Sequence, residues 1–500
     1  MSEAKLTEPS KSSGIPVRPR IEIREVGVVR EIRESIAKVD GLPSVLNGQI
    51  VHFGHENKGM VMGFSEKEVL VLMFGGKERI KAGDEVWSRG ESFTLPVGEK
   101  YIGRIVNGLC EPCDGKPAIE PDAYLPAFCV APGVMERKPV CHPLDTGIKI
   151  LDAIIPVAKG QRQLLIGDRM TGKTTIGIDT IINQGDKNVI CIYCCIGRSY
   201  SNLLKVVEVF KEKKAFPYTM IVAGIASAPV GEQFLAPYTA CTLGEYFMQR
   251  GKDVFVVFDD LTKHAWVYRQ LSLLLERPPG REAYPGDIFY IHSQLVERAG
   301  QFNDENGGGS MTFFPICDTL QGDVTGYVQT NLISMTDGQT MISSALFNQG
   351  VKPAIDFGLS VSRIGNKASV PAMKKLAGRL RLEYLQYKEL VRMTQLKTSL
   401  SDEASARIRR GEVITELLMQ NKHEPASMEE QIMHLYALKQ GILDPLTNQT
   451  LKKFKKEIVH FGRSQFPHVM SDLCACWDLT DSVKKGLDEM FQTYLAGNKK

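Results

Sequence analysis

The sequence predicts a protein of three domains: an N-terminal β-barrel, a central α/β domain with a mainly parallel sheet, and a C-terminal α-helical domain. Length is the first indication, because 500 residues with 43% apolar content exceed a single compact domain of roughly 100–200 residues. The second is a series of short, close apolar runs, followed by apolar runs that alternate with helix-like segments. The third is a helical spacing of apolar residues after Pro371.

The first domain is expected at residues 22–94. Its apolar runs, such as 59–64 and 69–74, are short and are separated by charged residues or glycines, which is typical of strands in a small barrel or sandwich. Residues 1–21 are polar and lack both the apolar core of a secretory signal and the amphipathic character of a transit peptide. We therefore expect a flexible N-terminal segment there.

The central domain is expected at residues 95–369 and the helical domain at residues 370–500. Alternation of strand-like and helix-like segments in the central domain is typical of an α/β core with a mainly parallel sheet. In the last domain Leu380, Tyr384 and Tyr387 recur at helical spacing. The strand-like runs of the central domain are 163–166, 189–196, 219–223 and 254–258.

The composition argues against several classes of protein. Lys and Arg total 61 against 58 Asp and Glu, and a net charge of +3 gives no long-range attraction towards nucleic acid. No run approaches the roughly 18 apolar residues that a membrane-spanning helix needs, so any membrane association is expected to go through partners. The 11 cysteines, without a secretory signal, indicate a reducing compartment and free thiols.

Residues 167–174 carry the strongest motif. They satisfy the phosphate-binding pattern G-x-x-x-x-G-K-[ST] between a strand-like run and a helix-like one. The glycines let backbone N–H groups surround phosphate oxygens, Lys173 adds a cation near the outer phosphates, and Thr174 can ligate Mg²⁺. The residues predicted to bind nucleotide here are Gly167, Asp168, Arg169, Met170, Thr171, Gly172, Lys173 and Thr174.

A second acid is needed to hold the magnesium ion, normally at the end of a buried strand. The apolar run 254–258 ends on Asp259, which we predict as the second metal-binding residue beside Thr174. The alternative is that Asp259 and Asp260 only cap the strand.

Hydrolysis also needs a group that activates water, often a Glu at the end of an adjacent strand. The run 189–196 ends instead in Gly197-Arg198, and an arginine does not accept a proton at physiological pH. The sequence therefore predicts a chain that binds Mg-ATP and does not cleave it.

These motifs resemble those of alpha subunits of F-type ATP synthases, from about Val26 to the C-terminus. The resemblance is carried by the P-loop segment 161–174, by 268–287, and by 353–362. It implies a RecA-like central domain and a ring of three alpha and three beta chains around a gamma-subunit shaft. In that family the beta chains make ATP, and their catalytic Glu corresponds to Arg198, where alpha chains usually carry Gln.

The resemblance also implies roles for particular residues. Arg363 matches the arginine that alpha subunits project into the catalytic site of the adjacent beta chain, where it would stabilise the charge of the transition state. Four residues match the adenine pocket of the family: Phe347, Lys352, Pro353 and Gln420. Departures from the family pattern are Arg198, Met170, Lys352 and Lys422.

The partners implied by the resemblance are the beta subunit, the gamma subunit, and the delta subunit of the peripheral stalk. Contact with the membrane would be indirect, through the ion-translocating sector, at the cytoplasmic face of a bacterial inner membrane. The polar stretch 9–20 differs from the amphipathic helix with which bacterial alpha chains usually begin.

Two other functions fit parts of the sequence. A self-sufficient hexameric ATPase motor, for secretion or RNA translocation, would need a carboxylate where Arg198 stands. A structural ring subunit without nucleotide would not need the P-loop and Asp259.

Overall fold

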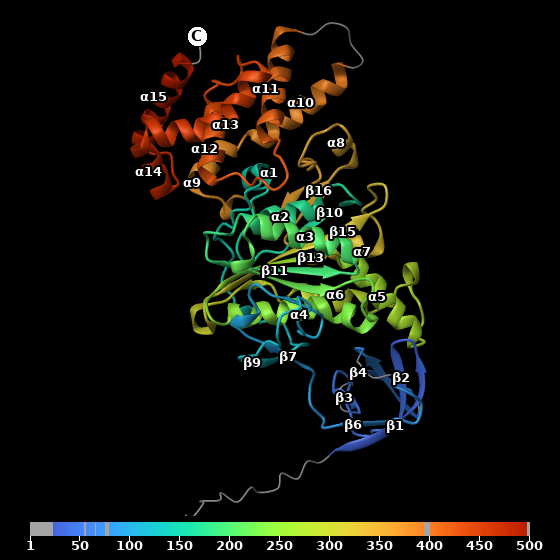
Figure 1. Ribbon diagram of the computed structural model, residues 1–500. Helices are drawn as coiled ribbons and strands as arrows, with labels where there is room; N and C mark the ends of the chain where they lie inside the picture. Colours follow the sequence, from blue (N-terminus) through green and yellow to red (C-terminus); the bar gives the residue numbers. More distant parts are fainter. Residues whose placement is uncertain (1–23, 55–56, 66, 76–79, 395–400, 498–500) are drawn as a thin grey trace, which may run out of the picture.

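The computed structural model describes residues 24–54, 57–65, 67–75, 80–394 and 401–497, which form three parts stacked in chain order (Figure 1). A strand barrel comes first, a helix-covered sheet lies in the middle, and a group of helices completes the chain. The predicted three-part fold is confirmed. The flexible segment predicted for residues 1–21 lies outside the described residues.

The N-terminal sheet closes on itself in the order β1-β2-β5-β4-β3-β6, so the domain is a barrel and not a sandwich. Its interior is filled mainly by valines, because their branched side chains fit a pleated, buried surface. Close packing requires Gly59, whose added Cβ would lie 2.7 Å from a methyl carbon of Val71. The strands are β1 Glu25–Arg33, β2 Ile36–Gly41, β3 Ile50–Phe53, β4 Asn57–Phe64, β5 Glu68–Met73 and β6 Glu85–Ser88.

The central sheet has the order β17-β16-β10-β15-β13-β11-β12-β8, with β14 paired to β15. All neighbours are parallel except the pairs that β14 and β17 make. The carboxyl ends of the parallel strands therefore share one edge, where ligands bind in open α/β sheets. The strands are β8 Ile105–Val106, β10 Gln163–Asp168, β11 Val189–Ile196, β12 Thr219–Gly224, β13 Asp253–Asp259, β14 Gly300–Gln301, β15 Ser310–Thr319, β16 Gly338–Ile342 and β17 Val361–Ser362; a separate pair joins β7 Thr94–Val97 to β9 Ala123–Pro126.

Helices cover both faces of the central sheet (Figure 1). The sequence of β11 is apolar throughout because both faces of this strand are buried. Cys191, Tyr193 and Cys195 belong to the core formed with α2 and α3, and Ile192 and Cys194 belong to the core formed with α4. The cysteines of this strand are thus buried packing residues. The helices are α1 Lys149–Ile154, α2 Lys173–Ile182, α3 Tyr200–Glu212, α4 Val230–Met248, α5 Leu261–Leu274, α6 Ile288–Val296, α7 Tyr327–Met335 and α8 Ser344–Asn348.

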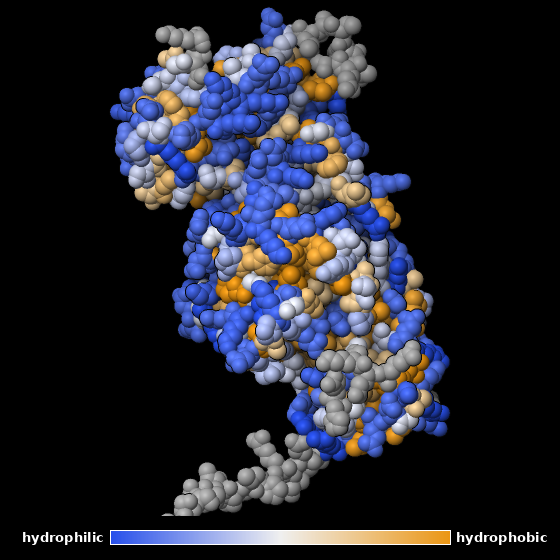
Figure 2. All heavy atoms as spheres, viewed as in Figure 1, coloured by the Kyte–Doolittle hydropathy of each residue, from blue (hydrophilic) through white to orange (hydrophobic). Residues whose placement is uncertain are grey.

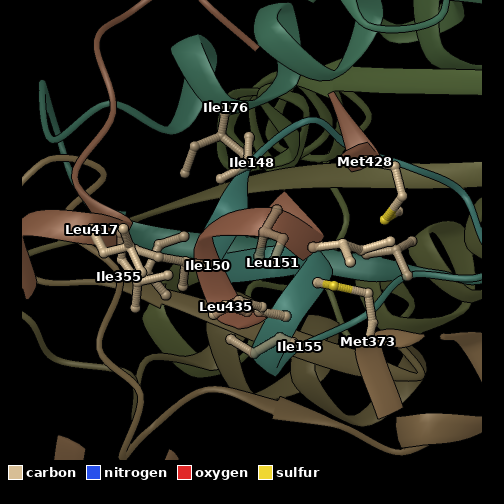
Figure 3. Packing of buried hydrophobic residues seen from close by; sticks show 14 of the residues in the cluster. Ile148, Ile150, Leu151, Ile155, Ile176, Ile355, Met373, Leu417, Met428 and Leu435 are labelled. Carbon is tan, nitrogen blue, oxygen red and sulfur yellow. The ribbon is translucent and has the colours of Figure 1, made fainter. Parts of the chain in front are cut away.

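The C-terminal helices share a continuous core with the central domain. Leu151 of α1 lies among Met373, Met428 and Leu435 of the helical domain (Figure 3). The helical domain is therefore packed onto the central domain and not merely tethered to it. Its helices are α9 Pro371–Ala377, α10 Leu380–Thr394, α11 Asp402–Leu418, α12 Met428–Lys439, α13 Asn448–Gln465, α14 Pro467–Cys476 and α15 Asp481–Gly497.

Apolar side chains also reach the surface. In Figure 2, orange atoms gather on the visible face of the central domain, whereas the helical domain is mostly blue there. Leu359 is 59% exposed and Leu382 of α10 is 58% exposed. Their segments lie side by side, because Arg381 of α10 donates a hydrogen bond to Ser360 O at 3.1 Å. Among the described residues, no helix combines the length and apolarity needed to cross a membrane.

Candidate functional site

The P-loop connects the carboxyl end of β10 to the start of α2. Two of its residues have left-handed backbone conformations, Met170 with φ 62° and Gly172 with φ 104°. Gly167 cannot carry a side chain, because an added Cβ would lie 2.4 Å from Ile342 O on the neighbouring strand β16. The loop thus turns tightly onto the N-terminus of α2, where free backbone N–H groups and the helix dipole favour an anion.

Lys173 is buried inside this loop, with 4% of its surface exposed. Its Nζ donates to Gly167 O at 2.7 Å and to Asp168 O, and it lies 3.1 Å from Asp318 Oδ1. The ammonium group is therefore already fixed at the centre of the loop, where the predicted phosphates would be.

The side chain of Asp168 stabilises the P-loop through hydrogen bonds to neighbouring segments. Its Oδ1 accepts hydrogen bonds from Thr319 Oγ1 and Gly322 N, each at 2.7 Å, and its Oδ2 accepts one from Ser344. Burial alone would raise the pKa of Asp168, but these hydrogen bonds hold the pKa below its usual value. Of the predicted nucleotide-binding residues, Asp168 is thus placed to contribute through its backbone, while its side chain ties β10 to α8.

Three other P-loop side chains differ in exposure. Arg169 pairs with Asp318 at 3.3 Å and lies over the ring of Trp266 at 5.2 Å. Met170 is 93% exposed, and Thr171 Oγ1 donates to Asp168 O at 2.7 Å. The exposed apex formed by Arg169 and Met170 leaves the entrance of the loop open to solvent.

Asp259 lies where the sequence predicted it, at the end of β13 and beside the P-loop. It is fully buried, and its Oδ2 accepts hydrogen bonds from Thr174 Oγ1 at 2.8 Å and from Tyr193 Oη at 2.7 Å. Adjacent oxygens from a hydroxyl and a carboxylate fit Mg²⁺, which prefers oxygen ligands and keeps several waters. In the described part of the chain, no cluster of three or more His, Cys, Asp or Glu side chains could hold a metal ion. Phosphate and water would therefore supply the remaining ligands.

Arg198 stands at the carboxyl end of β11, where a catalytic acid would be sought. Its guanidinium contacts Asp259 Oδ1 and lies 3.7 Å from Asp260 Oδ2. Burial would lower the pKa of Arg198, but the Asp259 charge raises it well above its usual value, so the group stays cationic. Burial, and then the carboxylates of Asp318 and Asp259, raise the pKa of Asp260 to about 7. A permanent cation thus occupies the position that water activation would require.

The residues predicted for the adenine pocket are linked to one another through Lys352. Lys352 Nζ lies 4.8 Å from the centre of the Phe347 ring on α8, and Gln420 N donates to Lys352 O at 2.9 Å. Pro353 lines a small pocket together with Lys352 and residues of α10 and α11. Because Ser344 at the start of α8 contacts Asp168, the group is linked to the P-loop.

Arg363 lies at the opposite edge of the same sheet. It follows β17, and its N–H donates to Asp337 O just before β16 begins. Gln163 at the start of β10 pairs with Gly338, so Arg363 is separated from Asp168 by the length of β10, roughly 17 Å at about 3.3 Å per residue. Its side chain is exposed at a cavity of about 310 Å³ that Arg137, Arg162 and Lys367 also line.

Two residues of the site were missed by sequence reasoning. Asp318, at the end of β15, pairs with both Lys173 and Arg169. The sequence held a signal for Asp318, because this acid directly follows the apolar run 313–317, as Asp259 follows 254–258. Tyr193 had no such signal, since a tyrosine in an apolar strand usually belongs to the core.

Comparisons with known proteins cover nearly the whole chain. Residues 147–362 match the model described as ATP synthase alpha/beta family, nucleotide-binding domain. Residues 22–90 match the beta-barrel domain of that family, and residues 370–494 match the C terminal domain of the ATP synthase alpha/beta chain. The chain is 43% identical over 478 residues to an ATP synthase subunit alpha from Petrotoga mobilis, covering 95% of each protein.

Proposed function

Because the chain belongs to the ATP synthase alpha/beta family, we propose that it is the non-catalytic, nucleotide-binding alpha subunit of an F-type ATP synthase head. It binds Mg-ATP at its own P-loop and lends Arg363 to the catalytic site of a neighbouring beta subunit. There ATP is made or hydrolysed while H⁺ or Na⁺ crosses the membrane through another part of the complex.

The observation that carries this proposal is the cation at the end of β11. Arg198 contacts Asp259, and it stays protonated at any physiological pH. A water molecule beside the γ-phosphate would meet a guanidinium there and not a carboxylate that could accept its proton. Binding of the nucleotide is supported by Lys173 and Thr174, whereas its cleavage is not.

Donation of Arg363 to a neighbour is supported by its position in the sheet. The length of β10 separates it from its own P-loop, farther than an arginine side chain extends. Among the described residues no carboxylate pairs with its guanidinium, although the nearby Arg162 is paired with Asp337. The exposed Leu359, Val361 and Leu382 beside it form the kind of apolar surface that packs against another chain.

The assembly proposed is a ring of three of these chains and three beta chains. The gamma subunit passes through its centre, and the delta subunit of the peripheral stalk contacts the head. The complex lies at the cytoplasmic face of a bacterial inner membrane, and this chain reaches the membrane only through its partners. No contact with nucleic acid is proposed, since the net charge is only +3.

The isolated chain is expected to bind Mg-ATP without appreciable turnover, because Arg198 takes the place of the general base. Equilibrium dialysis measures the binding, and a phosphate-release assay on the same sample measures the turnover. Robust hydrolysis by the pure chain would favour a self-sufficient ATPase motor. Absence of binding would favour a structural ring subunit.

Lys173→Gln is expected to weaken ATP binding by roughly 10–100-fold, because a charged hydrogen bond contributes about 1.5–3 kcal/mol. The fluorescence of Trp266 can follow the titration, since Arg169 of the P-loop lies over its ring. Lys205→Gln, which removes an exposed charge from α3, is the matched control. Equal ATP affinity of the two variants would show that Lys173 does not contribute to binding.

A further inference from the structure

Arg198 is held in place by its backbone as well as by its charge. Gly197, with φ 59°, turns the chain at the end of β11, and its N–H donates to Gly224 O at 2.7 Å. Arg198 O accepts a hydrogen bond from Ala226 N at 2.9 Å. The guanidinium therefore leaves a fixed point on the sheet edge, one strand away from Asp259.

Arg198 balances the charge of the two deepest carboxylates of the site. Asp259 and Asp260 are both fully buried, and the Arg198 guanidinium lies within ion-pair distance of both of them. Lys173 does not take this role, because its Nζ is engaged by Asp318 and by P-loop carbonyls. Without Arg198, the buried Asp259 carboxylate would lose its cationic partner, and a metal ion is one group that could replace it.

The same contacts limit what Asp259 can offer to a metal ion. Its Oδ1 faces Arg198, and its Oδ2 already accepts hydrogen bonds from Thr174 and Tyr193. Mg²⁺ would approach a carboxylate whose charge is largely neutralised, so the electrostatic gain from adding the ion is reduced. Thr174 and Asp259 still offer oxygen ligands, but the electrostatic attraction between Asp259 and Mg²⁺ is weakened.

Arg198 also retains unused donor capacity. Its Nε is buried and has no hydrogen-bond acceptor among the described residues. A buried donor without a partner is unfavourable, and a phosphate oxygen is an acceptor that a guanidinium recognises well. The site thus combines Asp259, whose charge is paired, with Arg198, whose Nε–H can donate to a phosphate oxygen.

We propose that Arg198 acts as a tethered cation which replaces part of the role of magnesium, so that this chain holds a nucleoside triphosphate with little dependence on Mg²⁺. The inference rests on the proposed function, because it concerns the same nucleotide site. It makes Arg198 a specificity-determining residue for the metal-free form of the ligand, which carries more negative charge than its magnesium complex.

Isothermal titration calorimetry of the full-length chain with ATP tests this, once in excess Mg²⁺ and once in excess EDTA. In the wild type, the two dissociation constants are expected to differ by less than about threefold. For Arg198→Gln, the dissociation constant in Mg²⁺ is expected to be lower than that in EDTA by about tenfold or more. A tenfold difference corresponds to about 1.4 kcal/mol. Arg198→Lys should keep most of the metal-free affinity, and Lys205→Gln should behave as the wild type.

The outcomes separate the two proposals. If the wild type binds ATP about tenfold or more tightly with Mg²⁺ than with EDTA, the tethered-cation inference is wrong while the proposed function stands. An equal Mg²⁺ dependence in the wild type and Arg198→Gln also overturns it. If the wild type binds no ATP under either condition, the proposed function itself fails. The wild-type ratio decides the inference even if Arg198→Gln does not fold.

Discussion

Arg363→Lys is expected to lower steady-state ATP hydrolysis by the assembled alpha–beta complex by about 10³-fold or more, the effect typical of an arginine that stabilises a phosphoryl-transfer transition state from a neighbouring chain. Lysine keeps the charge but not the planar fork that can bond two oxygens at once. The loss should appear in kcat, because the interaction is proposed for the transition state. Phosphate release by the complex reassembled with a beta partner measures it.

Two controls make the Arg363 result specific. Lys367→Gln removes an exposed cation from the same cavity and should leave turnover unchanged. Assembly of the Arg363→Lys complex, followed by size-exclusion chromatography, should match the wild type. Its own P-loop should bind ATP normally, since the length of β10 lies between the two groups. Wild-type turnover in an intact Arg363→Lys complex would exclude Arg363 from the reaction.

Arg298→Met is expected to destabilise the central domain by about 3–5 kcal/mol, because it leaves a buried carboxylate without its partner. Arg298 is 1% exposed and makes two 2.6 Å hydrogen bonds to Glu245 of α4. It also donates to Ala127 O at 2.9 Å and to Thr242 Oγ1 at 3.0 Å. The guanidinium thus joins the end of α6, the C-terminal part of α4 and the segment that follows β9.

The three tryptophans allow this loss to be assigned to one domain. Trp87 lies in the barrel, Trp266 in the central domain and Trp477 in the helical domain. Urea unfolding followed by Trp266 fluorescence, in a Trp87→Phe and Trp477→Phe background, reports the free energy of the transition in which the central domain unfolds.

Two comparisons identify the cause of the Arg298 effect. The double variant Arg298→Met and Glu245→Met should recover most of the lost stability, because no buried charge remains unpaired. Arg463→Met, which removes an exposed arginine paired with the partly buried Glu429, should change stability by less than about 1 kcal/mol. A double variant as unstable as Arg298→Met would show that packing, and not the unpaired carboxylate, accounts for the loss.

Much of the fold was predictable because its signals are local. The apolar runs of β10, β11, β12 and β13 were each found within two residues of their observed ends, since fully buried strands leave long uninterrupted apolar stretches. The choice between barrel and sandwich was not local, because it depends on whether β6 pairs with β1 and closes the sheet. Such long-range pairing leaves little trace in the residues themselves.

The site also contains features with local sequence signals and features that depend on long-range packing. The P-loop and Asp259 follow from residue type, spacing and position after a strand, and the structure places them together. The pairing of Arg198 with Asp259 could not be predicted, because it depends on the order of strands in the sheet and on side-chain direction. The structure places the Arg198 guanidinium on the Asp259 carboxylate. The nucleotide-binding and Arg363 roles themselves stay predictions.

The P-loop and Arg363 lie at opposite ends of β10, and this constrains the symmetry of any assembly in which one chain completes its neighbour's site. Across a two-fold axis, a residue of one chain that contacts a second residue of its partner is matched by the reverse contact, so two sites would be completed at once and the assembly would end at two chains. A ring of more than two chains needs head-to-tail contacts instead, and these either close into a ring or continue as a helical filament. Because the parallel strands run in one direction, each subunit has two different surfaces, one that carries the P-loop and one that carries Arg363.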